Sequence, residues 1–182
     1  MAREFQIQSH LLASSAELAL GTRLGEAKAR EILRQQWIAV AWVAGQRLAR
    51  ALGRAGGGAE AVAAVLRLHA GLPPGFARAI EAGPDRVRIA LAAAGEGLLD
   101  PEQPGWLGLL ARGDGRGVEA AAQAVDPRAR VADLGVRDGR ISLEIAVDPE
   151  AAPAEAPKEA AFMHLSTATA WVFDTSEARL GL

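Results

Sequence analysis

Histidines are the side chains of this chain that are best suited to acid–base or metal chemistry, and there are three of them, His10, His69 and His164. None stands three or four residues from another histidine, and no carboxylate spacing beside them indicates a metal cage. His69 falls on the apolar face of an expected helix, where a residue at the edge of the core is the simpler interpretation. The sequence therefore predicts no metal site.

Nucleophilic catalysis is the second chemistry to consider, because Ser166 and Thr167 follow His164 and Asp174 lies near them. A Ser–His–Asp set needs an exposed nucleophile on a strained turn and an oxyanion hole. The G-x-S-x-G pattern that provides such a turn does not occur. We predict no catalytic residue and no cofactor, and an enzyme or accessory subunit that uses His164 and Asp174 ranks last among our hypotheses.

Glycines alternate with other residues over residues 113–117, just before a helix that we expect to begin at Val118. Helix N-termini bind anions. However, no strand precedes this segment, as a dinucleotide fingerprint requires, and it lacks the lysine of a P-loop. We interpret it as a turn between two helices, with an anion site as the alternative.

The tryptophans of this chain indicate a ligand-binding role rather than a catalytic one. Trp37, Trp42 and Trp106 could line a pocket for an aromatic or lipid-like ligand, since such pockets are mostly apolar with few polar groups. Gly45 costs a helix about 1 kcal/mol relative to alanine, which is tolerated where another backbone or a ligand approaches closely. The alternative is that the tryptophans fill the core. The predicted ligand-binding residues are Trp37, Ile38, Val40, Ala41, Trp42, Gly45 and Trp106.

One long helix over residues 24–52, ended by Gly53, must position most of these residues. Its apolar residues cover roughly 200° of the circumference, whereas packing on one core needs about 100°. Such a helix is buried on two sides, and the second side could contact core, a partner subunit or a ligand. The longest apolar run, residues 37–45, is about half of the ~20 residues that a membrane span needs, so we expect a buried helix in a soluble protein.

Hydrophobic periodicity predicts the remaining elements. Residues 4–8 alternate as in a short edge strand, and residues 11–20 favour a helix that Gly21 stops, after which Thr22 can cap the long helix. We expect further helices over residues 59–70, 76–82, 105–111 and 118–125, a strand over residues 86–91, and a loop over residues 95–104.

Asp138-Gly139 is the clearest local signal, because both residues tolerate the positive φ of a two-residue hairpin turn. The same register sets Asp133 opposite Glu144, a like-charge pair that Arg88 could relieve if its strand lies alongside. Pairing outward from the turn predicts three apolar pairs on one face: Val136 with Ile141, Leu134 with Leu143, and Ala132 with Ile145.

Composition places the chain among folded proteins, since half of its 182 residues are apolar and 23% are charged. The net charge of −2, with both signs mixed, gives little support for nucleic-acid binding or an anionic membrane. Cysteine is missing, which fits a reducing cytoplasm.

We expect an α+β domain over residues 1–148, whose helical N-terminal half packs on a small antiparallel sheet ending in a β-hairpin. An Ala/Pro-rich linker over residues 149–159 and a docked tail over residues 160–182 follow.

Short motifs along the chain follow one order: residues 27–33, Gly45 with residues 48–49 and 52–53, Glu-Gly-Leu-Leu at 96–99, Leu-Gly-Leu-Leu at 107–110, and the hairpin over 131–147. Over residues 15–148 this order resembles the vinyl-reductase-type small-molecule-binding domain and its relatives, the small subunits of vesicle-tethering transport particles. The resemblance implies an α+β fold that binds a hydrophobic or aromatic molecule between helices and sheet, commonly as a dimer, and it does not imply catalysis. The family's last hairpin usually carries cysteines, and their lack here argues against a metal or redox role.

We therefore predict a cytoplasmic, dimeric, non-enzymatic binding module for a hydrophobic small molecule, a sensor or carrier without nucleic-acid partner or membrane span. The alternative is an interaction protein or accessory subunit of a homodimer or hetero-complex, whose wide apolar helix is the interface. In that case a charge at Ala41 or Trp42 should break the oligomer and leave the monomer folded.

Overall fold

Three helices begin the fold, and two hairpins and two short helices follow. The computed structural model describes residues 2–54, 57–69, 71–72, 76–93 and 100–158. The fold is α+β, as the sequence predicts. Its elements are helices α1 (Ala2–Leu24), α2 (Glu26–Ala51) and α3 (Ala59–Leu68), strands β1 (Phe76–Ala82) and β2 (Arg86–Ala93), helices α4 (Trp106–Ala111) and α5 (Arg116–Gln123), and strands β3 (Ala129–Arg137) and β4 (Arg140–Val147).

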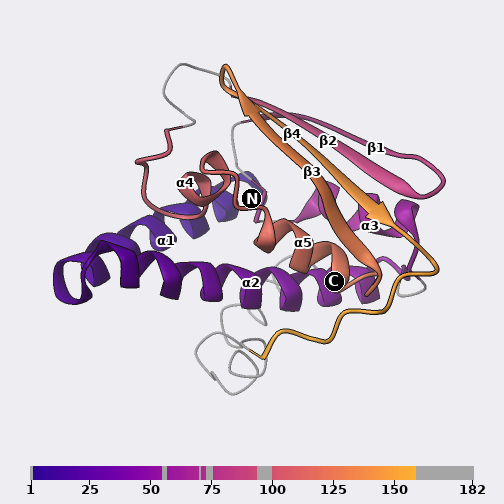
Figure 1. Cartoon of the computed structure of the whole chain (residues 1–182), viewed down its shortest axis with the longest axis horizontal. Coiled ribbons are helices and arrows are strands. Elements are labelled where there is room, and N and C mark those ends of the chain that lie inside the picture. The colour runs from indigo at the N-terminus through magenta and orange to yellow at the C-terminus, as the bar shows by residue number, and fades with distance from the viewer. Residues whose placement is uncertain (1, 55–56, 70, 73–75, 94–99, 159–182) are drawn as a thin grey trace.

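The four strands form one antiparallel sheet in the order β1-β2-β4-β3. Helices α3 and α5 lie between this sheet and α2, and α1 packs alongside α2 (Figure 1). Val87, Ile89 and Leu91 of β2 are buried, as their alternation predicts, and they pair with Ile145, Leu143 and Ile141 of β4. This apolar sheet face completes the core beneath the helices.

The predicted long helix is confirmed as α2, which is unbroken from Glu26 to Ala51. Gly53 ends it with φ of 63°, donating to Arg50 O, while Arg54 N donates to Ala49 O. These two hydrogen bonds form the Schellman motif that a glycine at this position allows. Along its length α2 contacts each of the other helices, α1, α3, α4 and α5.

The strand predicted at residues 4–8 is wrong, because these residues belong to α1. A five-residue alternation is too short to outweigh a continuous helix that packs on α2. Gly21 does not stop α1, and the Thr22 hydroxyl donates to Leu18 O and Ala19 O inside the helix instead of capping α2. The break between the two helices falls at Gly25, whose φ of 83° suits glycine.

The helix predicted at residues 76–82 is also wrong, because this segment is β1. Its alanines and its glutamate favour a helix in isolation, but pairing with β2 along its whole length decides the outcome. Helices α3, α4 and α5 and strand β2 occur where the sequence predicts them, with shifts of one to a few residues at their ends.

The Asp138-Gly139 hairpin turn is confirmed, with φ of 47° and 69°. Val136 pairs with Ile141 and Leu134 with Leu143, as predicted. The third predicted pair is wrong: a β-bulge at Ala132 puts Val131 opposite Ile145. Asp133 does lie opposite Glu144, and the strand of Arg88 lies alongside as expected, with Arg88 Nε 3.2 Å from Glu144 Oε2.

Residues 148–157 form neither helix nor strand. They run along the start of β3, where Ala154 N donates to Pro127 O and Arg130 Nη2 donates to Ala152 O. The predicted tail over residues 160–182, with His164, Ser166, Thr167 and Asp174, lies outside the described residues. In the described part of the chain, no helix combines the length and apolar character needed to cross a membrane.

Candidate functional site

Two of the predicted binding residues, Trp37 and Trp106, stack on each other in the protein interior. Their ring centroids are 6.3 Å apart and their planes differ by 14°. His10 of α1 meets Trp106 edge-on at 5.4 Å. Trp37 comes from α2 and Trp106 is the first residue of α4, so three helices converge on this aromatic cluster.

Helix α1 holds the segment that leads into Trp106. Gly105 N donates to Glu17 Oε2 at 2.5 Å, and Ser14 Oγ donates to Pro104 O at 3.0 Å. Glu17 is buried, and Arg30 Nε of α2 lies 3.6 Å from its other carboxylate oxygen. These contacts hold the backbone that leads into Trp106 against both long helices.

Trp106 Nε1 is buried and has no hydrogen-bond partner among the residues that the structure describes. The same holds for Gln103 Oε1, in the turn that precedes α4. A buried donor or acceptor without a partner costs about 1–3 kcal/mol. This donor and this acceptor are three residues apart in the chain. A polar group of a bound molecule, or an ordered water, would satisfy them.

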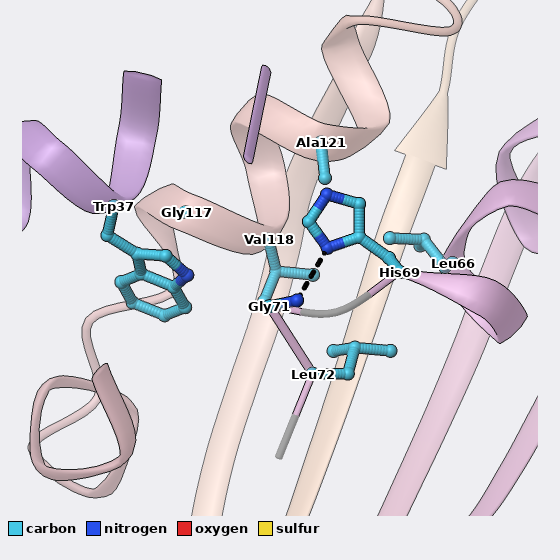
Figure 2. Close-up of a pocket in the computed structure, with 8 residues that line it drawn as sticks. All are labelled: Trp37, Leu66, His69, Gly71, Leu72, Gly117, Val118 and Ala121. Carbon is cyan, nitrogen blue, oxygen red and sulfur yellow. Dashed lines mark hydrogen bonds between the residues drawn. The ribbon is translucent and has the colours of Figure 1, made fainter. Parts of the chain in front are cut away.

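A closed pocket adjoins Trp37 where α2, α5 and the end of α3 meet (Figure 2). No charged side chain lines it, and no water-sized sphere fits among the side chains. Gly71 lies between the Trp37 indole and the His69 ring: a Cβ added there would be 3.3 Å from Trp37 Nε1 and 3.0 Å from His69 Nδ1. The lining residues are Trp37, Leu66, His69, Gly71, Leu72, Gly117, Val118 and Ala121.

His69 is the polar residue of this pocket, and its tautomer follows from its partners. Gly71 N donates to His69 Nδ1 at 2.9 Å, so Nδ1 is unprotonated and Nε2–H donates to Ala41 O at 3.0 Å. The ring is buried and neutral in this arrangement, and it ties the end of α3 to the middle of α2. The sequence predicts His69 at the edge of the core but does not indicate this bridge, because the partners of His69 are backbone groups that no spacing rule identifies.

Glycines let α5 lie close against α2. A Cβ on Gly117 would overlap Cδ2 and Cε2 of Trp37. On α2, a Cβ on Gly45 would be 2.8 Å from Ala121 O and 3.0 Å from Ala124 Cβ. The close approach expected at Gly45 is therefore made by the backbone of α5.

The structure distributes the other predicted binding residues over α2. Ala41 and Trp42 are 1% and 6% exposed, and Ile38 and Val40 are half-buried, but none of these four lines the pocket. A charge at Ala41 or Trp42 would therefore disturb the core of one chain, which is a correction to the expected test of an oligomer. The contacts of α2 with the other helices bury much of the wide apolar arc within one chain, and Ile38 and Val40 remain half-buried.

Asp114 occupies the N-terminus of α5, within the glycine-rich segment. Its Oδ1 accepts from Arg116 N at 3.2 Å, and its Oδ2 accepts from Arg34 Nε at 2.6 Å and from Arg116 Nη2 at 3.0 Å. Burial raises the pKa of Asp114, but the hydrogen bonds from Arg116 and Arg34 outweigh it and hold the pKa below its usual value. The segment is the predicted turn between helices, and a side chain of the chain itself takes the place of an external anion.

Among the described residues, no group of three or more His, Asp or Glu side chains is placed so that it could hold a metal ion. The fold and the site together define the protein as an α+β domain with a buried tryptophan pair beside a closed, uncharged pocket. Comparisons with protein-family models, curated proteins and solved structures found no match.

Proposed function

We propose that the protein is a non-enzymatic binding module for a hydrophobic or aromatic small molecule, acting as a sensor or carrier. The observation that carries this proposal is the Trp37–Trp106 stack, in which the Trp106 indole N–H is buried and has no partner in the described part of the chain. Structural tryptophans usually satisfy this donor when it is buried. An unsatisfied donor beside a flat aromatic surface fits a ring that carries an oxygen atom.

The chemistry of the surroundings narrows the ligand class. Because the pocket beside Trp37 has no charged lining residue and His69 is already bonded on both ring nitrogens, a neutral ligand is favoured. A phenol fits best: its oxygen can accept from Trp106 Nε1 and its ring can stack on an indole. The resemblance to the vinyl-reductase-type domain supports the same class, because that family binds hydrophobic or aromatic molecules between helices and sheet.

Entry of a ligand requires the lining residues to separate, since the pocket admits no water-sized sphere as it stands. The observed affinity is then the intrinsic affinity reduced by the fraction of molecules that are open. We expect weak binding of small phenols and tighter binding of a ligand with a larger apolar surface. The dimeric state and the cytoplasmic location expected from the sequence remain predictions.

Tryptophan fluorescence tests the proposal. The protein is titrated with a phenol, a long-chain fatty acid and a porphyrin, and a saturable change is expected with at least the phenol. Trp106→Phe keeps an aromatic ring but removes the N–H, and it should weaken phenol binding by about tenfold, the value of one hydrogen bond.

Val125→Ala is the matched control, because Val125 is a buried core residue that lies outside the pocket and the tryptophan pair. It should lower stability but leave phenol affinity unchanged. A folded protein that gives no saturable response to any of the three ligands would contradict the proposal, and so would an equal loss of affinity in both variants.

A further inference from the structure

Strand β3 forms one edge of the sheet, and side chains of α5 cap the first part of that edge (Figure 1). Gln123 Nε2 donates to Ala129 O at 3.1 Å, and Glu119 Oε2 accepts from Val131 N at 2.7 Å. These two backbone groups point away from β4, since neither is used in the sheet. An uncapped edge is a template for pairing with another chain, so these side chains prevent pairing there.

The opposite edge of the sheet, β1, carries a cap of the same kind. Arg67 Nη2 of α3 donates to Ile80 O at 2.9 Å. Helices packed on the sheet thus bond to backbone groups on both of its edges.

The end of β3 beside the hairpin turn has no such cap. Arg137 and Arg140 flank the two-residue turn and bond to each other, so every second residue before Arg137 bonds to β4 as well. Leu134 and Val136 lie between these residues and direct their N–H and C=O groups away from β4. No side chain in the described part of the chain bonds to these groups. We call the outward backbone groups of Leu134 and Val136 the open edge of β3.

The outer face of the sheet, which faces away from the helices, is hollowed beside the open edge of β3. Gly135 and Ser142 pair with each other in the lining of this hollow, and a Cβ on Gly135 would be 2.8 Å from Ser142 Oγ. The side chains of Leu134 and Val136 pack on the core instead. A neighbouring strand would therefore find room for one large side chain over Gly135.

Two like-charge pairs flank the hollow. Asp133 lies opposite Glu144 on one side of the Gly135–Ser142 pair, and Arg137 lies opposite Arg140 on the other. Among the described residues, no ion pair involves Asp133, Arg137 or Arg140. Like charges directly opposite each other in a sheet are destabilising, so each pair favours an opposite charge from outside.

We propose that the open edge of β3 binds an extended peptide segment of another protein, which adds a fifth strand to the sheet, antiparallel to β3. The backbone of the peptide bonds to Leu134 and Val136. Its side chains on the outer face are an acidic residue opposite Arg137, a large apolar residue over Gly135 and a basic residue opposite Asp133. A strand suits this edge because its donors and acceptors recur at every second residue, as those of the open edge do.

A second copy of β3 fits this edge less well than such a peptide. Antiparallel self-pairing about Gly135 would also set Asp133 opposite Arg137. However, it would place Gly135 against Gly135 and leave the hollow empty, so the contacts that a large side chain makes there would be missing. The inference is independent of the proposed ligand, because the open edge of β3 lies outside the tryptophan pair and its pocket.

Fluorescence anisotropy of a labelled peptide, Glu-Val-Trp-Ile-Lys with blocked ends, tests the proposal on the full chain. We expect saturable binding with a dissociation constant of roughly 100 µM, because a short flexible peptide gives up much conformational freedom. The charge-exchanged peptide Lys-Val-Trp-Ile-Glu has the same composition and should bind roughly fivefold more weakly. A folded protein that binds neither peptide, or both equally, would overturn the proposal.

Val136→Pro tests whether the backbone of β3 makes the contact. Proline removes the outward N–H of residue 136 but no hydrogen bond to β4, so it should weaken binding of Glu-Val-Trp-Ile-Lys about tenfold. Val136→Ala is the matched control: it shortens the same side chain, keeps the N–H and should leave the affinity unchanged. An equal loss of affinity in both variants would overturn the edge contact.

Exchanging the charges of the protein gives a test that does not depend on the backbone. Asp133 and Arg137 are exposed, so Asp133→Lys combined with Arg137→Glu should fold normally and should prefer Lys-Val-Trp-Ile-Glu. An unchanged peptide preference would overturn the proposed pairing. Light scattering covers the other occupant: a dimer of the unmodified chain that Val136→Pro dissociates would assign the edge to a second copy, which also overturns the proposal.

Discussion

The indole of Trp37 lies directly on the backbone of Gly117, and no side chain fits between them. This contact joins the middle of α2 to the first turn of α5. The same indole also stacks with Trp106. The position of the candidate site therefore depends on Gly117, which the sequence pattern predicts only as part of a turn.

Gly117→Ala is predicted to destabilise the protein. Alanine improves helix propensity by up to about 1 kcal/mol, but the added Cβ overlaps the indole, and overpacking of this kind costs about 1–3 kcal/mol. Urea unfolding measures the difference. Gly21→Ala is the control: Gly21 lies inside α1 with open space around it, and this change should stabilise by about 0.5–1 kcal/mol. Equal effects at the two positions would contradict the packing that we describe.

How far the fold follows from the sequence depends on how local each signal is. The Asp138-Gly139 turn and the alternation of Val87, Ile89 and Leu91 are local, and both are confirmed. The bulge at Ala132 and the strand β1 are decided by pairing with β4 and β2, which local patterns do not contain.

The candidate site follows from the sequence only in part, for the same reason. Helical spacing predicts that Trp37 is buried, and Trp106 is a candidate because tryptophans are few in this chain. The stacking of the two rings depends on how α4 docks between α1 and α2, which the sequence does not show. His69 bonds to the carbonyl oxygen of Ala41, 28 residues away. Side-chain-to-backbone contacts between distant segments cannot be predicted from residue types or their spacing.

His69→Phe is predicted to lower the free energy of unfolding by about 1–3 kcal/mol, because it leaves the Gly71 N–H without its buried acceptor. Hydrogen exchange gives a direct second readout: the Gly71 amide should be protected in the unmodified protein and exchange faster in the variant. Leu68→Phe, at the exposed neighbouring position, should change stability by less than about 0.5 kcal/mol. A Gly71 amide that is unprotected in the unmodified protein would refute the bridge.

Arg88 is predicted to screen the like-charge pair of Asp133 and Glu144. Both Arg88 and Arg86 reach Glu144, at 3.2 and 3.1 Å, on a largely exposed sheet face. Arg88→Ala should therefore cost less than about 1 kcal/mol. Asp133→Asn should be nearly neutral alone and stabilising by a few tenths of a kcal/mol in the Arg88→Ala background. A double-mutant cycle with no coupling would show that Arg88 does not screen this pair.

Asp114 is predicted to make stability fall in acid. Its folded-state pKa is held below the usual value, so its contribution is fully present above the unfolded-state pKa of about 4 and is lost as pH falls through the lower, folded-state pKa. Asp114→Asn removes the carboxylate that pairs with Arg34 Nε and should cost about 1–3 kcal/mol at pH 7. The difference from the unmodified protein should begin to shrink below about pH 4, where the carboxylate of the unfolded chain is protonated, and should vanish only below the lower, folded-state pKa.

Asp85→Asn is the matched control for Asp114→Asn. A hydrogen bond from Arg86 lowers the pKa of Asp85 too, but this pair is exposed to solvent, so its removal should leave stability unchanged at every pH. Urea unfolding from about pH 3 to about pH 8 compares the three proteins. A stability gap for Asp114→Asn that stays constant over this range would mean that the loss arises from packing at the start of α5, because only the ionic contribution of Asp114 titrates with its carboxylate.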